Sequence, residues 1–156
     1  MYTPEEAKQI RKEFWDTFAK RCELVPELKY RRKKWVLYDT KISGVHLKFE
    51  VDRNEALVIL EINNRSESRR LQIYETLERY KLLLEEGFDD GLIWDFCVVR
   101  ESGQEVCRIY EKMPRADIHR QSQWPDIFNF LIENMMKLEA NFMEVRDAVQ
   151  EEIRPE

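Results

Sequence analysis

The chain has 156 residues, of which 43% are hydrophobic and 37% are charged, with a formal net charge of −5. This length and the 12% of aromatic residues fit one compact domain with a substantial core, and they exclude intrinsic disorder for most of the chain. No apolar run approaches the roughly 20 residues of a membrane helix, and the acidic N-terminus is unlike a secretory signal, so we expect a cytoplasmic protein with no membrane contact.

The first predicted element is a helix over about residues 4–22. Thr3 is suited to the N-cap, Pro4 fits the first helical position, and Glu6 completes a capping box. Apolar residues then recur at steps of three and four, which gives one buried stripe, until Pro26 ends the pattern.

A β-hairpin is predicted over about residues 44–63. Apolar and polar residues alternate over residues 45–51, which is typical of a half-buried strand, and a polar turn follows. Residues 56–62 are almost continuously apolar, as expected of a strand that is covered on both faces or lies mid-sheet. A further short strand is predicted over about residues 35–42.

The order of hairpin and helix then repeats. A helix is predicted over about residues 67–86, a second hairpin over about 91–113, and a long helix over about 124–152. Short links make both strand pairs antiparallel. The predicted fold class is therefore α+β, with an antiparallel sheet of four or five strands packed against three helices in the order α-β(β)β-α-ββ-α, in a single domain of residues 1–156.

Five short patterns characterise this chain further. They are Glu13-Phe14-Trp15, Lys33-Lys34-Trp35, the hairpin GVHLKFEVDRNEALVILEI, Arg108-Ile109-Tyr110, and Trp124-Pro125-Asp126 ahead of the long helix. In these patterns the chain resembles a bacterial family of domains of unknown function, over nearly its whole length. The resemblance implies a short stand-alone bacterial protein, whose kind of domain also occurs at the C-terminus of longer chains with a nuclease-like N-terminal region. It implies no catalytic residues.

The strongest local charge feature is a basic segment between the first helix and the first hairpin. It consists of Lys29, Tyr30, Arg31, Arg32, Lys33, Lys34 and Trp35. Cations neutralise phosphates, and an aromatic ring can stack on an unpaired base, so this segment is a candidate nucleic-acid-binding site. The alternative is a solvated loop in which Trp35 is a core residue, and the acidic net charge favours it.

Acidic residues of the first hairpin suggest a second candidate, a magnesium site. Asp52 is followed on the next strand by Glu61, and paired carboxylates of this kind hold magnesium in nuclease folds. Asn63 stands where such sites carry a lysine, and the strand register decides whether Glu50 and Asp95 converge with them. Structural ion pairing is the simpler interpretation, so we assign no metal ligand, and a degenerate metal-dependent nuclease is the least favoured function.

The sequence holds no motif of a common enzyme or cofactor. His46 and His119 are the only histidines, no serine or cysteine lies in a GxSxG setting, and the four glycines form no phosphate-binding loop. The three cysteines lack CxxC spacing. We therefore assign no catalytic residue and no cofactor, and an enzyme is less favoured than a binding protein.

The long C-terminal helix offers a candidate contact surface. Its apolar residues are spaced alternately by three and four positions, as in a coiled coil. Its far end, with Phe142, Val145 and Val149, is a candidate surface for dimerisation or for a partner. The favoured function is thus a non-enzymatic protein-interaction module that binds another protein or itself, and nucleic-acid binding is the alternative.

Overall fold

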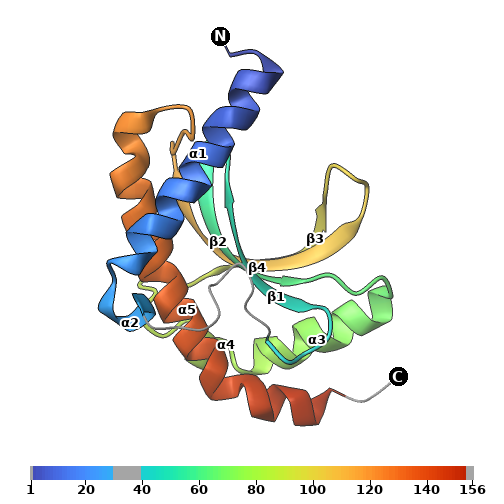
Figure 1. The fold of residues 1–156 in the computed structure, drawn as a ribbon. Coiled ribbons are helices and arrows are strands. Elements are labelled where there is room, and N and C mark those ends of the chain that lie inside the picture. Colours follow the sequence, from blue (N-terminus) through green and yellow to red (C-terminus); the bar gives the residue numbers. More distant parts are fainter. Residues whose placement is uncertain (1, 30–39, 154–156) are drawn as a thin grey trace.

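The computed structural model describes residues 2–29 and 40–153 (Figure 1). In chain order the elements are α1 (Pro4–Glu23), α2 (Pro26–Lys29), β1 (Val45–Val51), β2 (Glu55–Ile62), α3 (Glu67–Arg79), α4 (Lys81–Leu84), β3 (Ile93–Val99), β4 (Glu105–Pro114), the 3-10 turn η2 (Gln121–Gln123) and α5 (Trp124–Glu152). Among the described residues, no helix is both long and apolar enough to cross a membrane.

The four strands form one antiparallel sheet in the order β1-β2-β4-β3. Each hairpin therefore contributes its second strand to the centre of the sheet and its first strand to an edge. The α+β class and the antiparallel sheet predicted from the sequence are confirmed, with four strands among the residues that the structure describes. Every residue of β2 from Ala56 to Ile62 is buried, as the apolar sequence of this segment predicts for a central strand.

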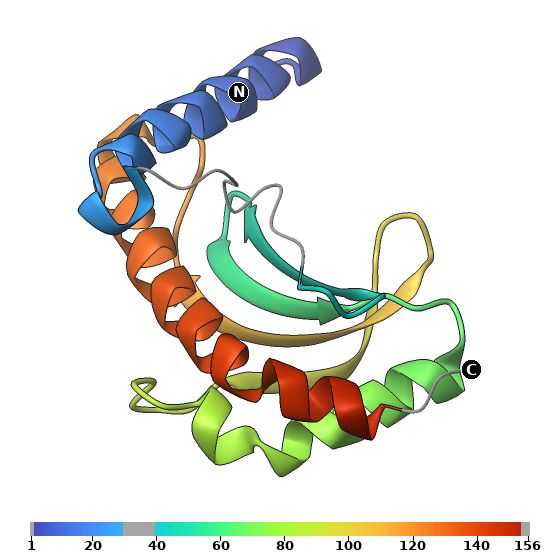
Figure 2. The ribbon, with the colours of Figure 1, turned by 60° about the horizontal axis from the view of Figure 1, so that its bottom comes forward.

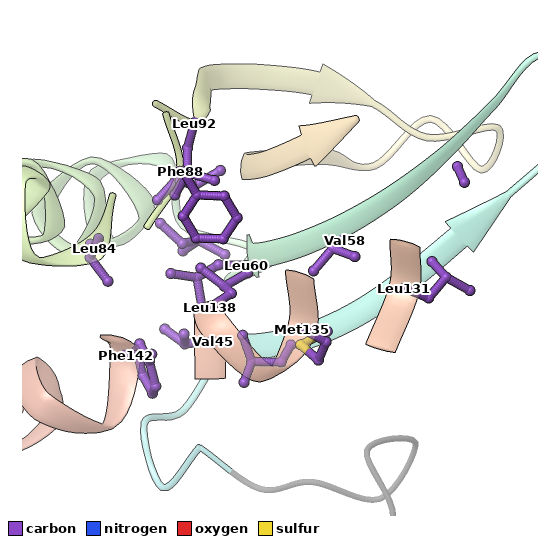
Figure 3. Close-up of a cluster of buried hydrophobic side chains, with 14 of the residues drawn as sticks. Val45, Val58, Leu60, Leu84, Phe88, Leu92, Leu131, Met135, Leu138 and Phe142 are labelled. Atoms are coloured by element: carbon purple, nitrogen blue, oxygen red, sulfur yellow. The ribbon is translucent and has the colours of Figure 1, made fainter. Parts of the chain in front are cut away.

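The helices lie on one side of the sheet. Figure 2 shows α5, α3 and α4 along the convex side of the curved sheet, with α1 at one end. The apolar stripe of α5 faces the sheet, and Figure 3 shows its Leu131, Met135 and Leu138 beside Val58 and Leu60 of β2. Burial of this stripe, rather than helix propensity alone, is what stabilises so long a helix.

Aromatic contacts join α1 to the start of α5. The ring of Phe14 lies 5.3 Å from that of Trp124 and 5.0 Å from that of Phe128, between ring centroids. Thr3 forms the predicted capping box with Glu6, whose backbone N–H donates to the Thr3 hydroxyl at 3.1 Å. The first helix is thereby fixed at its start by a cap and along its length by packing.

The structure has more helices than the three that the sequence pattern predicts. The segment predicted as one helix over residues 67–86 consists of α3 and α4, because Tyr80 leaves the helical conformation with φ −105° and ψ 20°. The Tyr80 hydroxyl donates a 2.6 Å hydrogen bond to Glu152 near the end of α5. The single-turn helix α2 was not predicted. The strand predicted over 35–42 lies mostly outside the described residues, and residues 40–42 are not in a strand.

Candidate interaction surface

The sheet face that points away from the helices carries a row of polar residues. Strand register places His46 of β1 opposite Glu61 of β2, Glu61 opposite Arg108 of β4, and Arg108 opposite Asp95 of β3. The row thus crosses all four strands. We call this side of the sheet the polar face, and none of the described helices packs against it (Figure 2).

Glu61 is the centre of an ion-pair network on the polar face. Its side chain is only 1% exposed. Its carboxylate accepts hydrogen bonds from Lys48 Nζ at 3.3 Å, from Arg108 Nε at 3.0 Å and from Arg100 Nη2. Arg108 also donates from Nη2 to Glu50 at 2.9 Å. Three cations and two carboxylates from three strands and the end of a fourth are therefore joined around one buried group.

The network determines the charge state of its central members. Burial opposes ionisation of Glu61 and is the largest single influence, but Lys48, Arg100 and Arg108 together hold its pKa below its usual value. Burial also disfavours the charged form of Arg108, whereas its hydrogen bonds and charge pairing with Glu50 and then Glu61 raise its pKa. Glu61 is consequently an ionised carboxylate at neutral pH, and its oxygens are engaged with cations.

This arrangement is suited to holding strands together rather than to proton transfer. A catalytic carboxylic acid needs a pKa raised toward the working pH, which is the opposite of the shift at Glu61. Ionic groups are costly to bury, and removal of one partner leaves the others uncompensated. The network fixes β1, β2 and β4 to Arg100, which follows β3, and so orients the β3–β4 hairpin.

The carboxylate pair considered for magnesium does not come together. Asp52 Oδ1 accepts hydrogen bonds from the backbone N–H groups of Asn54 and Glu55 and so caps the β1–β2 turn. Glu61 pairs with His46, at the other end of β1. At about 3.3 Å per strand residue, the two carboxylates are on the order of 20 Å apart. Among the described residues, no group of three or more histidines, cysteines or acidic residues is arranged to hold a metal ion.

Glu50 and Asp95 differ in their relation to this network. Glu50 joins it through Arg108. Asp95 lies opposite Arg108 in the register, but its Oδ1 accepts a hydrogen bond from the Cys97 N–H at 3.2 Å. Strand register, which the sequence does not specify, decides both outcomes.

The structure describes only part of the basic segment. Its first residue, Lys29, ends α2, and the remaining residues lie outside the described part of the chain: Tyr30, Arg31, Arg32, Lys33, Lys34 and Trp35. Nucleic-acid binding by this segment therefore stays a prediction.

The residues of α5 that the sequence suggests as a partner surface are buried. Each is at most 1% exposed and belongs to the core of the chain itself: Phe142, Val145 and Val149. Their spacing reflects packing against the sheet and neighbouring helices, so a partner surface on α5 needs other side chains. His119 lies outside the polar row, and its ring contacts that of Tyr2.

The edge strand β3 is not among the candidate sites that the sequence predicts. Its sequence, IWDFCVV, has one charged residue, yet none of its seven residues is buried. Ile93 is 40% and Val99 62% exposed. The available signal was the absence of polar alternation in a strand that begins a hairpin, because an apolar strand is normally covered on both faces. Only the strand order reveals that β3 lies at an edge.

Comparison with known proteins places the chain in a family. A search of curated proteins and a search of solved structures found no match. The model of the family described as Domain of unknown function (DUF4268) matches residues 10–146, which include every strand and most of α1 and α5. The membership in a domain-of-unknown-function family that the sequence patterns predict is thus confirmed, and the chain belongs to the family of the Domain of unknown function (DUF4268).

Proposed function

We propose that this chain is a non-enzymatic protein-interaction module whose partner binds along β3. The observation that carries this proposal is an apolar edge strand without a buried residue. An edge strand presents unpaired backbone N–H and C=O groups, which another extended strand can satisfy. A partner that covers exposed apolar side chains such as Val99 removes them from water, and this burial stabilises the complex.

The polar-face network supports binding rather than catalysis. Glu61 is held ionised by three cations, and Arg108 is engaged with two carboxylates, so neither group is poised to exchange a proton. The same network links Arg100, which follows β3, to the centre of the sheet. A rigidly held edge loses little conformational freedom when a partner binds, which favours affinity.

The test compares partner capture by three forms of the full chain. The first is the native sequence, and the second carries Ile93→Lys and Val99→Lys on β3. The third carries Leu82→Lys on α4, where the side chain is 87% exposed and lies outside the sheet. We expect the native and α4 forms to retain the same proteins from a lysate of cells that express the chain, and the β3 form to lose them. Equal capture by all three forms would contradict binding at β3.

Nucleic-acid binding by residues 29–35 is the second candidate. It rests on a sequence observation, the five basic residues within 29–34 beside Tyr30 and Trp35. The proposal predicts binding of labelled single-stranded DNA or RNA that weakens steeply with salt, because phosphate contacts release counterions. The variant carrying Lys33→Glu and Lys34→Glu should lose this binding. Fluorescence anisotropy at low and near-physiological salt measures it, and absent or salt-insensitive binding would remove this candidate.

A further inference from the structure

The edge of β3 is preformed by contacts with the rest of the chain. The Glu85 carboxylate accepts hydrogen bonds from the Leu92 backbone N–H at 2.7 Å and from Trp94 Nε1 at 3.0 Å. The Tyr74 ring of α3 lies 5.8 Å from the ring of Trp94 and 5.4 Å from that of Phe96, between centroids. The aromatic side chains of β3 are therefore held against the chain's own α3, and the strand is fixed before any partner arrives.

What this packing leaves exposed is a set of apolar residues with little charge, here called the apolar strip, with Ile93 on the polar face and Val99 on the opposite face of the strand. Ile93, Cys97 and Val99 are exposed, and Val98 is partly so. Asp95 is the single charged residue of β3. The other edge strand, β1, carries His46, Lys48 and Glu50, and such charges protect an edge against pairing. Lysine and proline, two common protective residues, are absent from β3, although its pairing with β4 shifts register between Asp95 and Val98.

From these observations we infer that β3 pairs with β3 of a second copy of this chain, antiparallel across a two-fold axis. The inference rests on the proposed function and names its partner. In a two-fold arrangement the same strand of each copy forms the contact. An apolar strand without lysine or proline therefore meets an equally apolar strand in the second copy. Two chains that each carry −5 repel one another least where they meet at nearly uncharged strands.

Charge at the ends of the strand favours the antiparallel arrangement. The exposed acidic turn Asp89-Asp90 precedes β3, and Arg100 follows it. Parallel pairing would bring two of these acidic turns together, whereas antiparallel pairing places them at opposite ends of the paired strands. The β3–β4 hairpin also projects from the side of the molecule away from α1 (Figure 1), which leaves the strand accessible.

The predicted dimer is weak. One pair of short strands buries less surface than the roughly 1,200 Å² that typical stable interfaces exceed. Association should therefore depend on concentration, and it should be measured from low micromolar to near-millimolar protein. The physiological assembly then depends on local concentration or on further contacts that β3 pairing brings together.

Sedimentation velocity of the full chain tests the inference. We expect a monomer–dimer equilibrium that Val99→Lys weakens by about tenfold or more, because it places a cation in each copy of the paired strip. Leu82→Lys on α4 is the matched control and should leave the equilibrium unchanged. A native chain that stays monomeric at every concentration, or a dimer that Val99→Lys does not weaken, would overturn the inference.

Cross-linking gives a second readout on the native chain, which does not depend on the folding of a variant. Cys97 lies next to the middle of β3 and is exposed, while Cys107 is buried. Antiparallel pairing about the strand centre brings the two Cys97 thiols close together. A short bismaleimide should give a covalent dimer that Cys97→Ser abolishes, and a dimer without this cross-link would contradict pairing at β3. If the native chain is monomeric but the β3 variant still loses its captured partners, the second copy is wrong and the proposed function stands.

Discussion

The two hairpins have the same topology but opposite edges. Each places its second strand in the centre of the sheet and its first at an edge. The edge strand β1 alternates polar and apolar residues and buries Val45, Leu47 and Val51, whereas the more apolar β3 buries none of its residues. Hydrophobic composition therefore does not determine burial at an edge. Hydrophobic composition instead indicates which edge strand is expected to bind a partner, because an exposed apolar edge strand otherwise promotes aggregation.

The largest expected difference in stability is between variants of the two carboxylates that lie opposite Arg108. Glu61 on β2 and Asp95 on β3 both lie beside it in the register. Glu61→Ala removes a buried carboxylate that three cations share, and we expect it to lower the free energy of unfolding by about 3–5 kcal/mol. Asp95→Ala removes a half-buried group outside the ion-pair network and should cost less than about 1 kcal/mol.

Chemical denaturation of both variants measures this difference. Arg108→Met serves as the control for the network, since it removes the cation that bridges Glu61 and Glu50. The double variant of Glu61→Ala and Arg108→Met should lose less stability than the sum of the single losses, because the two groups act as a pair. Equal losses of unfolding free energy for Glu61→Ala and Asp95→Ala would contradict the distinction between Glu61, which belongs to the ion-pair network, and Asp95, which does not.

The contribution of Glu61 should also depend on pH. Its pKa in the folded chain is below the value of 4.5 expected for the unfolded chain, so the unfolded state binds the proton first as the pH falls. The stability that Glu61 contributes is therefore complete above about pH 4.5 and is lost as the pH falls through the lowered pKa. The difference in unfolding free energy between the native chain and Glu61→Gln should be constant at neutral pH and should narrow in acid. A difference that does not change with pH would contradict an ionised Glu61.

The sequence predicts the architecture better than the site, for physical reasons. Capping at Thr3 and the spacing of apolar residues in α5 are local signals, and both elements form as predicted. The Glu61 network depends on which residues of four strands become neighbours, and register is a non-local property. The same spacing that suggested a dimer seam at Phe142 is satisfied by the chain's own core, because periodicity shows that a face is buried but not what covers it.

A smaller difference in stability is expected between the edge strands β1 and β3 when one valine of each is replaced by alanine. Val51 of β1 is 1% exposed and Val99 of β3 is 62% exposed. Val51→Ala deletes buried methyl groups and leaves a cavity, so we expect a loss of about 2 kcal/mol in the free energy of unfolding. Val99→Ala should change it by less than about 0.5 kcal/mol in dilute protein. A comparable loss at both positions would mean that Val99 packs within the monomer and is not part of a free strip.

The smallest expected effect concerns the tips of the two hairpins. Arg100 joins the second hairpin to the sheet, since its Nη2 donates to Glu61 and its Nη1 donates to Gln104 Oε1 at 3.0 Å. Arg100→Gln should lower the unfolding free energy by only about 1 kcal/mol, because the pair is partly solvated. Its main effect should be local: hydrogen exchange should become faster at the Arg100 and Gly103 amides, whose backbone hydrogen bonds close this turn.

Arg53→Gln is the matched control in the β1–β2 turn, which Asp52 closes without Arg53. It should change neither the unfolding free energy nor the rate of hydrogen exchange. Faster exchange at Gly103 together with unchanged dimerisation would show that the strip of β3 keeps its shape without the network. Loss of dimerisation in Arg100→Gln would show instead that the buried carboxylate of the first hairpin holds the second in the conformation that pairs.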